Sequence, residues 1–138
     1  MASRERPNEP RRRVFATGLG AVTSAGPDVA ALRAALHGDR TCIGEVTLFE
    51  TEGLKTHIAG EVRELRVPRL LPRAARVRAS RSDRLALLAV EEALAHGGLA
   101  LPFPDPARVG VAIGSSTGGM LETESYYRTR LANEPARA

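Results

Sequence analysis

The sequence predicts an α/β fold in which a mixed sheet packs against a buried helix. Two short runs of β-forming residues, at 14–17 and 109–113, each lead directly into a glycine-rich turn and then into a helical pattern. Between them, residues 80–97 carry apolar side chains around much of a helix circumference, which is typical of a helix buried on several sides. Strands that alternate with helices in this order are characteristic of α/β domains.

The first unit combines a short buried strand, residues 14–17, with a helix. Asp28 is in position to cap that helix, and Gly38 is in position to end it. Residues 1–13 precede the strand and are polar and basic, with two prolines, so they predict a disordered basic tail. This tail has no apolar stretch of the kind found in secretory signals.

The middle of the chain is less regular. Residues 39–63 contain short β-like pieces, including HIAGEV at 57–62. Residues 64–79 are rich in arginine and carry two prolines, which indicates an irregular or partly helical surface segment.

The second unit begins with the buried helix. Ser80 and Asp83 have the spacing of a capping box, and Gly97 and Gly98 end the helical pattern. The run VGVAI at 109–113 then predicts a buried parallel strand, and the stretch from Leu121 onward predicts a final helix.

Composition narrows the function classes. The chain has 138 residues, enough for one domain, with 43% hydrophobic and only 4% aromatic residues, so its core must consist of Ala, Leu and Val. The net charge of +4 is weak evidence for nucleic-acid binding, because the two tyrosines lie far from the arginine-rich segment. The single Cys42 cannot form a disulfide within the chain, and no apolar run is long enough for a membrane helix. A cytoplasmic protein is expected.

The glycine-rich turns do not match phosphate-binding motifs. Gly18 and Gly20 supply two positions of a dinucleotide fingerprint, but Thr23 stands at the third, and Asp39 does not follow a second strand. The turn GSSTGGM has no lysine for a P-loop. The glycines therefore predict close packing, and His37 and His96 are expected to be exposed helix-end residues.

Five motifs in register resemble a known family. They are TGLGAVTSAG, FETEG, HIAGEV, RLALLAVEEALAHGGL and RVGVAIGSSTGGM. Together they resemble the N-terminal part of β-ketoacyl-acyl-carrier-protein synthases, the elongating condensing enzymes of fatty-acid and polyketide synthesis. The resemblance implies a partial thiolase-like fold, with residues 14–138 as the N-terminal fragment of a synthase domain.

The resemblance also implies which chemistry is missing. The family's nucleophilic cysteine and two active-site histidines lie further along the chain than the equivalent of Ala138, and Cys42, His37, His57 and His96 match none of those motifs. We therefore expect no catalytic residue, metal or cofactor in these residues. By family the protein is an acyltransferase, but the chain by itself is expected to be inactive.

Two candidate sites follow from the resemblance. Thr117 and Met120 match a family segment beside the acyl-binding tunnel, and Thr117 falls where side-chain bulk limits acyl-chain length. Arg73, Arg76 and Arg78, with Arg69 and Arg81 as neighbours, match the region where the family binds its acidic acyl carrier protein.

The resemblance further implies that the full-length form is a dimer. The chain alone would expose the apolar flank of its sheet and buried helix, so we expect a poorly stable monomer that needs the remainder of the synthase or a second subunit. Two alternatives remain open from the residues: a non-catalytic partner of the chain-length-factor type, and an unrelated small basic binding protein.

Overall fold

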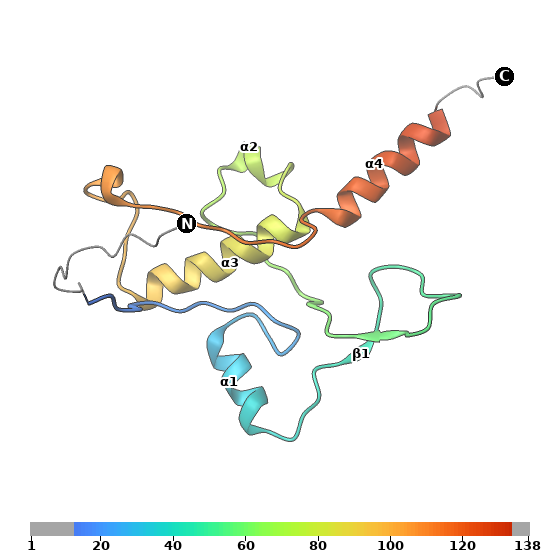
Figure 1. Cartoon of the computed structure of the whole chain (residues 1–138), viewed down its shortest axis with the longest axis horizontal. Coiled ribbons are helices and arrows are strands. Elements are labelled where there is room, and N and C mark those ends of the chain that lie inside the picture. The colour runs from blue at the N-terminus through green and yellow to red at the C-terminus, as the bar shows by residue number, and fades with distance from the viewer. Residues whose placement is uncertain (1–12, 134–138) are drawn as a thin grey trace, which may run out of the picture.

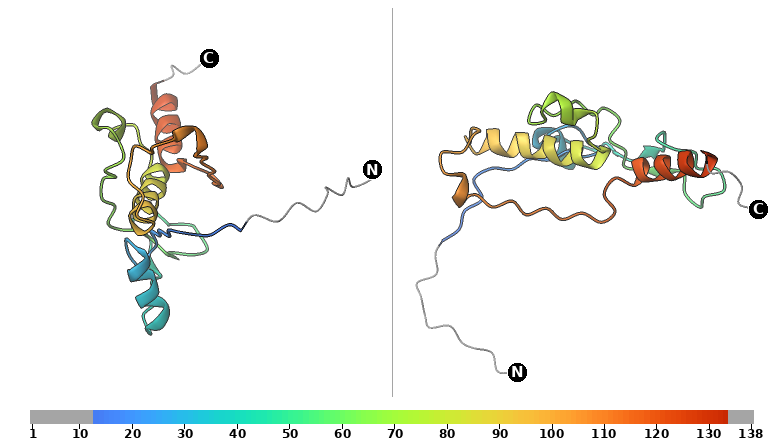
Figure 2. Two further views of the ribbon diagram at one scale, coloured as in Figure 1. Left: turned by 90° about the vertical axis from the view of Figure 1, so that its left-hand side faces the viewer. Right: turned by 90° about the horizontal axis from the view of Figure 1, so that it is seen from above.

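The computed structural model describes residues 13–133, and its central element is the helix α3, Arg81–His96. An extended segment from residue 13 to residue 22 runs along α3, a turn closed by Thr23 and Gly26 follows it, and the helix α1, Val29–His37, lies below (Figure 1). The arrangement is open. The helix α4, Met120–Asn133, extends outward beyond the N-terminal end of α3 (Figure 1), although in the right-hand view of Figure 2 it overlaps the segment between residues 44 and 59.

Helix α1 begins and ends where the sequence predicts. The Asp28 carboxylate accepts a hydrogen bond of 2.7 Å from the backbone N–H of Ala31, so Asp28 is the N-cap. Gly38 follows the last helical residue, and its N–H donates back to the carbonyl of Ala35.

Helix α3 confirms both predicted ends. The Ser80 hydroxyl accepts from the Asp83 N–H, and the Asp83 carboxylate accepts from the Ser80 N–H, which completes the capping box. At the other end, the Leu99 N–H donates to the Leu94 carbonyl at 2.8 Å, and Gly98 has a φ of +65°. This is a Schellman motif, in which glycine adopts a left-handed conformation at low cost.

The remaining elements are short. Strands β1, Gly44–Glu45, and β2, Ile58–Ala59, pair antiparallel, which confirms a strand within 57–62. Helix α2, Arg73–Arg76, is one turn inside the arginine-rich segment and confirms that this segment is partly helical. A 3₁₀ turn, Pro106–Arg108, precedes the second glycine-rich stretch.

The predicted buried strands at 14–17 and 109–113 are wrong for the described residues. Both segments are unpaired and exposed: Val14 is 91% exposed, Val111 is 83% and Ile113 is 76%. A parallel strand is buried only when other strands bond to its edges and helices cover its faces. Within residues 13–133 the one sheet is the β1–β2 pair, so no mixed sheet forms around these two segments.

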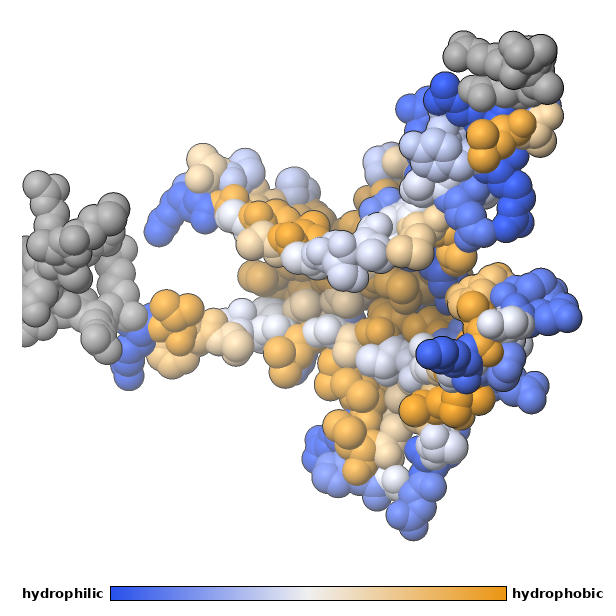
Figure 3. Space-filling model, turned by 45° about the vertical axis from the view of Figure 1, so that its right-hand side comes forward, coloured by the Kyte–Doolittle hydropathy of each residue, from blue (hydrophilic) through white to orange (hydrophobic). Residues whose placement is uncertain are grey.

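Helix α3 is also less buried than predicted. Leu88 is buried, at 3% exposure, and Pro68 of the arginine-rich segment is buried as well, while Val90 on α3 is 43% exposed. Apolar side chains reach the surface in patches along the central elements (Figure 3). The disordered tail predicted for residues 1–13 lies almost wholly outside the described residues.

Candidate functional site

The glycine-rich segment, residues 17–26, packs directly on the backbone of α3. A Cβ added at Gly18 would overlap the carbonyl oxygen of Ala93, and one added at Gly20 would lie 2.8 Å from the carbonyl carbon of Ala89. No side chain fits at either position, because the neighbouring atoms belong to a helix backbone that cannot rotate away. The prediction of close packing is confirmed for Gly18 and Gly20, but it is wrong for Gly114 and Gly118 of the second glycine-rich turn, where an added Cβ would meet no atom within 4 Å.

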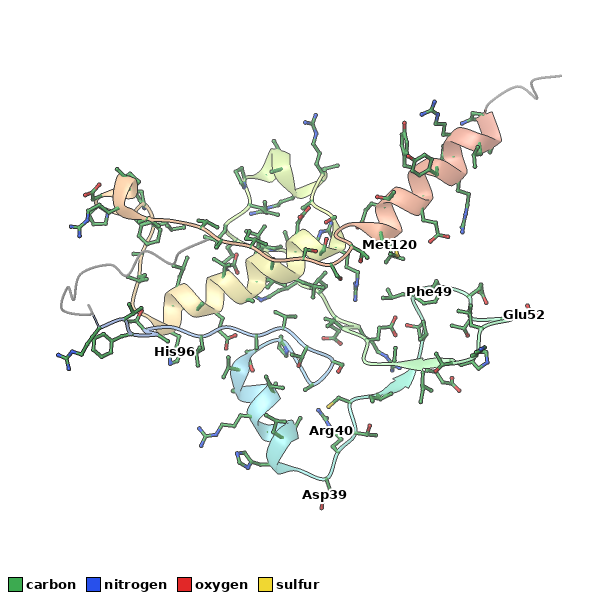
Figure 4. The ribbon with its side chains drawn as sticks, viewed as in Figure 1. Asp39, Arg40, Phe49, Glu52, His96 and Met120 are labelled. Carbon is green, nitrogen blue, oxygen red and sulfur yellow. The ribbon has the colours of Figure 1, made fainter. Side chains whose placement is uncertain are left out.

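Two side chains of α3 accept hydrogen bonds from the backbone of the same segment, and one of them also bonds the first residue of α1. The Glu92 carboxylate accepts from the Ala21 N–H and from the Val29 N–H, each at 2.8 Å. His96, labelled in Figure 4, accepts from the Leu19 N–H through Nδ1 at 3.0 Å. These N–H groups are therefore occupied, and the carboxylate beside them would repel a phosphate, which argues against a nucleotide site here.

Glu91, the neighbour of Glu92, holds the segment that precedes α2. Its carboxylate accepts from the Leu70 N–H at 2.8 Å and forms an ion pair of 2.7 Å with Arg66. Burial acts to raise the pKa of Glu91, but these hydrogen bonds and the nearby guanidinium outweigh it and hold the pKa below its ordinary value.

The chain segments that carry the two candidate sites approach each other at the N-terminus of α3. A Cβ added at Gly119 would lie 3.0 Å from the Ser80 Cβ, and the Glu122 carboxylate accepts from the Arg81 N–H at 2.7 Å. Glu122 belongs to the first turn of α4 and satisfies an N–H that the first turn of α3 leaves free. This contact places the start of α4 beside the end of the arginine-rich segment.

The three predicted carrier-contact residues, Arg73, Arg76 and Arg78, are all exposed. The Arg76 Nε donates to the Leu71 carbonyl at 3.1 Å, which holds its guanidinium against the turn that carries it. Arg81, named as a neighbour of this patch, behaves differently: it is half-buried, and its guanidinium donates to the Val62 carbonyl.

The predicted acyl-pocket residues lie at the surface of the described chain. Thr117 belongs to an exposed turn in which the Gly118 N–H donates to the Ser115 Oγ at 3.2 Å. Met120 begins α4 and is 56% exposed (Figure 4). A groove of about 860 Å³ lies elsewhere, between Pro27, Leu70 and Leu101.

The other titratable candidates are not brought together. Cys42 is half-buried near β1, and the His57 ring contacts the Thr51 hydroxyl at 2.9 Å. Within residues 13–133 no group of three or more His, Cys, Asp or Glu side chains could hold a metal ion. No helix in that range has the length and apolar character needed to cross a membrane.

Sequence reasoning missed the tertiary roles of Glu91, Glu92, Glu122 and His96. Each bonds a backbone N–H that is between 21 and 77 residues away along the chain. One signal was available: Glu91 and Glu92 interrupt an otherwise apolar helix, and a charged residue at a half-buried position needs a partner.

Comparison with known proteins identifies a family that the chain matches over most of its length. Residues 11–137 match the family described as "Beta-ketoacyl synthase, N-terminal domain". The chain is 36% identical over 84% of its length to "Putative polyketide beta-ketoacyl synthase 1" of Streptomyces cyaneus, and 32% identical over 91% to "3-oxoacyl-[acyl-carrier-protein] synthase 2" of Coxiella burnetii. It is 32% identical over 88% to "Nodulation protein E" of Rhizobium meliloti. The chain spans 28% of the first relative's length and 30% of each of the other two.

Proposed function

The chain belongs to the β-ketoacyl synthase family, and we propose that it forms the N-terminal part of an enzyme that extends acyl chains by decarboxylative condensation. The match covers residues 11–137 and therefore includes every element that the structure describes. Relatives named for polyketide synthesis and for acyl-carrier-protein-dependent synthesis support the reaction class without separating the two pathways.

The proposed reaction forms one carbon–carbon bond. The acyl group is held on a cysteine as a thioester. The carbanion that remains when malonyl-carrier protein loses carbon dioxide attacks the carbonyl carbon of this thioester. The thiolate leaves, and the product is a β-ketoacyl thioester on the carrier protein. None of the residues described here matches the nucleophile or the histidines of this reaction, so we propose that the chain contributes structure and recognition to chemistry performed by other residues.

The packing of Gly18 and Gly20 on α3 is the observation that carries the proposal. It joins the first and fourth of the five family motifs in space, although they are about 70 residues apart in the sequence. A glycine segment that served a nucleotide would leave its N–H groups free, whereas here His96 and Glu92 occupy them.

A chimera tests the proposal. Residues 11–137 replace the matching segment of the Coxiella burnetii synthase, and the product is assayed with acyl- and malonyl-carrier protein. We expect β-ketoacyl product from the chimera and none from the chain alone. We also expect amide hydrogen exchange at 109–113 to slow in the chimera, because the rest of the synthase would pair and cover this segment. A folded chimera without product, beside an active parent, would contradict the proposal.

We further propose that Arg73, Arg76 and Arg78 bind the acidic carrier protein. Their exposure supports this role, and their guanidinium groups suit carboxylate and phosphate partners. In the active chimera, reversal of the three charges to glutamate should weaken carrier-protein affinity on the order of tenfold at low salt. The matched control reverses three exposed arginines elsewhere: Arg33, Arg108 and Arg128. Equal affinity losses in the two triple variants would refute a specific patch.

The proposed acyl-pocket residues are Thr117 and Met120. They lie beside the contact between Gly119 and Ser80, so a chain bound there would pass close to the N-terminus of α3. In the chimera, Thr117→Gly should lengthen the longest acyl chain that the enzyme accepts, whereas Ser116→Gly on the same exposed turn should not. An unchanged product distribution for Thr117→Gly would show that this residue does not limit chain length.

A further inference from the structure

One face of α3 bonds one edge of the glycine-rich segment at two points. His96 accepts from the Leu19 N–H, and Glu92 accepts from the Ala21 N–H. The two acceptors are four residues apart on a helix, about 6 Å along its axis, and the two donors are two residues apart on extended chain, about 6.6 Å. The two spacings agree, so one turn of helix matches two residues of strand.

This match lets α3 take the place of a neighbouring strand. Alternate N–H groups of an extended chain point to the same side, and a second strand would normally accept from them. Here two side chains accept instead, and they do so beside Gly18 and Gly20, where the segment touches the α3 backbone. The hydrogen bonds and the glycine contacts therefore hold the same few residues in place.

The two bonds differ in their response to protons. His96 accepts through Nδ1, so its ring must be neutral with the proton on Nε2. A proton added to Nδ1 would face the Leu19 N–H as a second donor, and the bond would be lost. A protonated His96 ring would instead be stabilised by the carbonyl groups at the C-terminal end of α3. His96 is the last residue of that helix, and the negative end of the helix dipole attracts cations.

We infer that Glu92 and His96 form a latch that positions the glycine-rich segment on α3 and loosens as His96 gains a proton. Histidine is the side chain that ordinarily changes charge between pH 5 and pH 8. His96 and Glu92 are positioning residues in this scheme, because they act through the backbone that they hold.

Side chains of both signs of charge line the groove that contains His96. Arg33 and His37 of α1 line the same groove as His96, and Glu92 of α3 lines it as well. The packed residues 18–20 and 97–101 carry no ionisable side chain. Both oxygens of Glu92 are already bonded to N–H groups.

Hydrogen exchange of the full chain tests the latch. Peptides that cover residues 14–25 are compared at pH 8 and pH 5 in the wild type, His96→Asn and His37→Asn. Asparagine can accept from the Leu19 N–H with Oδ1 and does not titrate. At each pH the exchange rate of the wild type is divided by that of His96→Asn, which cancels the intrinsic pH dependence of amide exchange. We expect the wild type to lose protection about fivefold relative to His96→Asn on going to pH 5, as for one hydrogen bond. His37→Asn should behave as the wild type does.

A wild type and His96→Asn that share one pH dependence would overturn the inference. If His96→Asn fails to fold, nitrogen chemical shifts of labelled histidine in the wild type decide the question. The assigned His96 ring should carry its proton on Nε2 at pH 8. A His96 ring with its proton on Nδ1 at that pH would overturn the inference as well.

Discussion

The substitution Gly20→Ala tests the contact on which the described fold depends. The added Cβ would overlap the Ala89 carbonyl oxygen and would lie 2.8 Å from both the Ala89 carbonyl carbon and the Ala93 nitrogen, whereas ordinary contacts lie at 3.4–4 Å. Since these atoms belong to the α3 backbone, the segment must move away by more than about 1 Å to reach ordinary contact distance.

Such a movement breaks more than the contact itself. The bond from the Ala21 N–H to Glu92 is 2.8 Å long, and an outward shift of about 1 Å would bring it beyond hydrogen-bond range. A hydrogen bond to a charged group contributes about 1.5 to 3 kcal/mol, and overpacking costs about 1 to 3 kcal/mol. We therefore expect Gly20→Ala to destabilise the fold by about 3 kcal/mol, which lowers Tm by about 10 °C.

Thermal unfolding followed by far-ultraviolet circular dichroism measures this effect. Gly114→Ala is the matched control, because it makes the same chemical change where no atom lies within 4 Å of the new Cβ. The control should melt at or slightly above the wild-type temperature, since alanine lowers the entropy of the unfolded chain. If the two variants melt within about 2 °C of each other, the packing argument is wrong.

Three further outcomes are expected. Ser80→Ala should lower the free energy of unfolding by about 1 kcal/mol through loss of the α3 cap, measured by urea unfolding. Glu91→Gln should destabilise the chain by about 1 to 2 kcal/mol at pH 7. Because the folded-state pKa of Glu91 is lowered, its contribution is complete above the ordinary glutamate pKa and lost as pH falls through the lower folded value, so the difference in unfolding free energy between the two proteins should shrink as the pH falls below the ordinary glutamate pKa in the same assay. Glu122→Gln should speed hydrogen exchange at the Arg81 amide, because a neutral amide is a weaker acceptor; unchanged exchange would contradict the proposed contact between α3 and α4.

The local elements could be predicted from the sequence because their signals are local. Asp28, Ser80 with Asp83, and Gly98 each define a helix end through bonds to residues at most five positions away, and the structure places all of them as expected. The glycine packing was also predictable, since neighbouring glycines after a β-forming run indicate a place where a Cβ does not fit.

The tertiary bonds could not be predicted in the same way. Nothing next to Glu92 in the sequence identifies Ala21 as its partner, 71 residues away, and His96 gave no signal beyond its position at a helix end. The strands at 14–17 and 109–113 failed for a related reason. Their composition indicates that they suit a sheet interior, but burial depends on neighbours that the described residues do not supply.

The open form of the chain bears on how it would work as part of a synthase. Within residues 13–133 many large apolar side chains, Val14 and Val77 among them, are exposed rather than packed into a core. Exposed β-forming residues such as Val111 and Ile113 are the natural places for other strands to pair. Any segment that pairs there binds the folded form and not the unfolded chain, so it stabilises the glycine packing and the two ends of α3 by mass action. Folding of these residues and assembly of the synthase would then be one coupled equilibrium, and the stability changes expected for Gly20→Ala should reappear as weaker assembly.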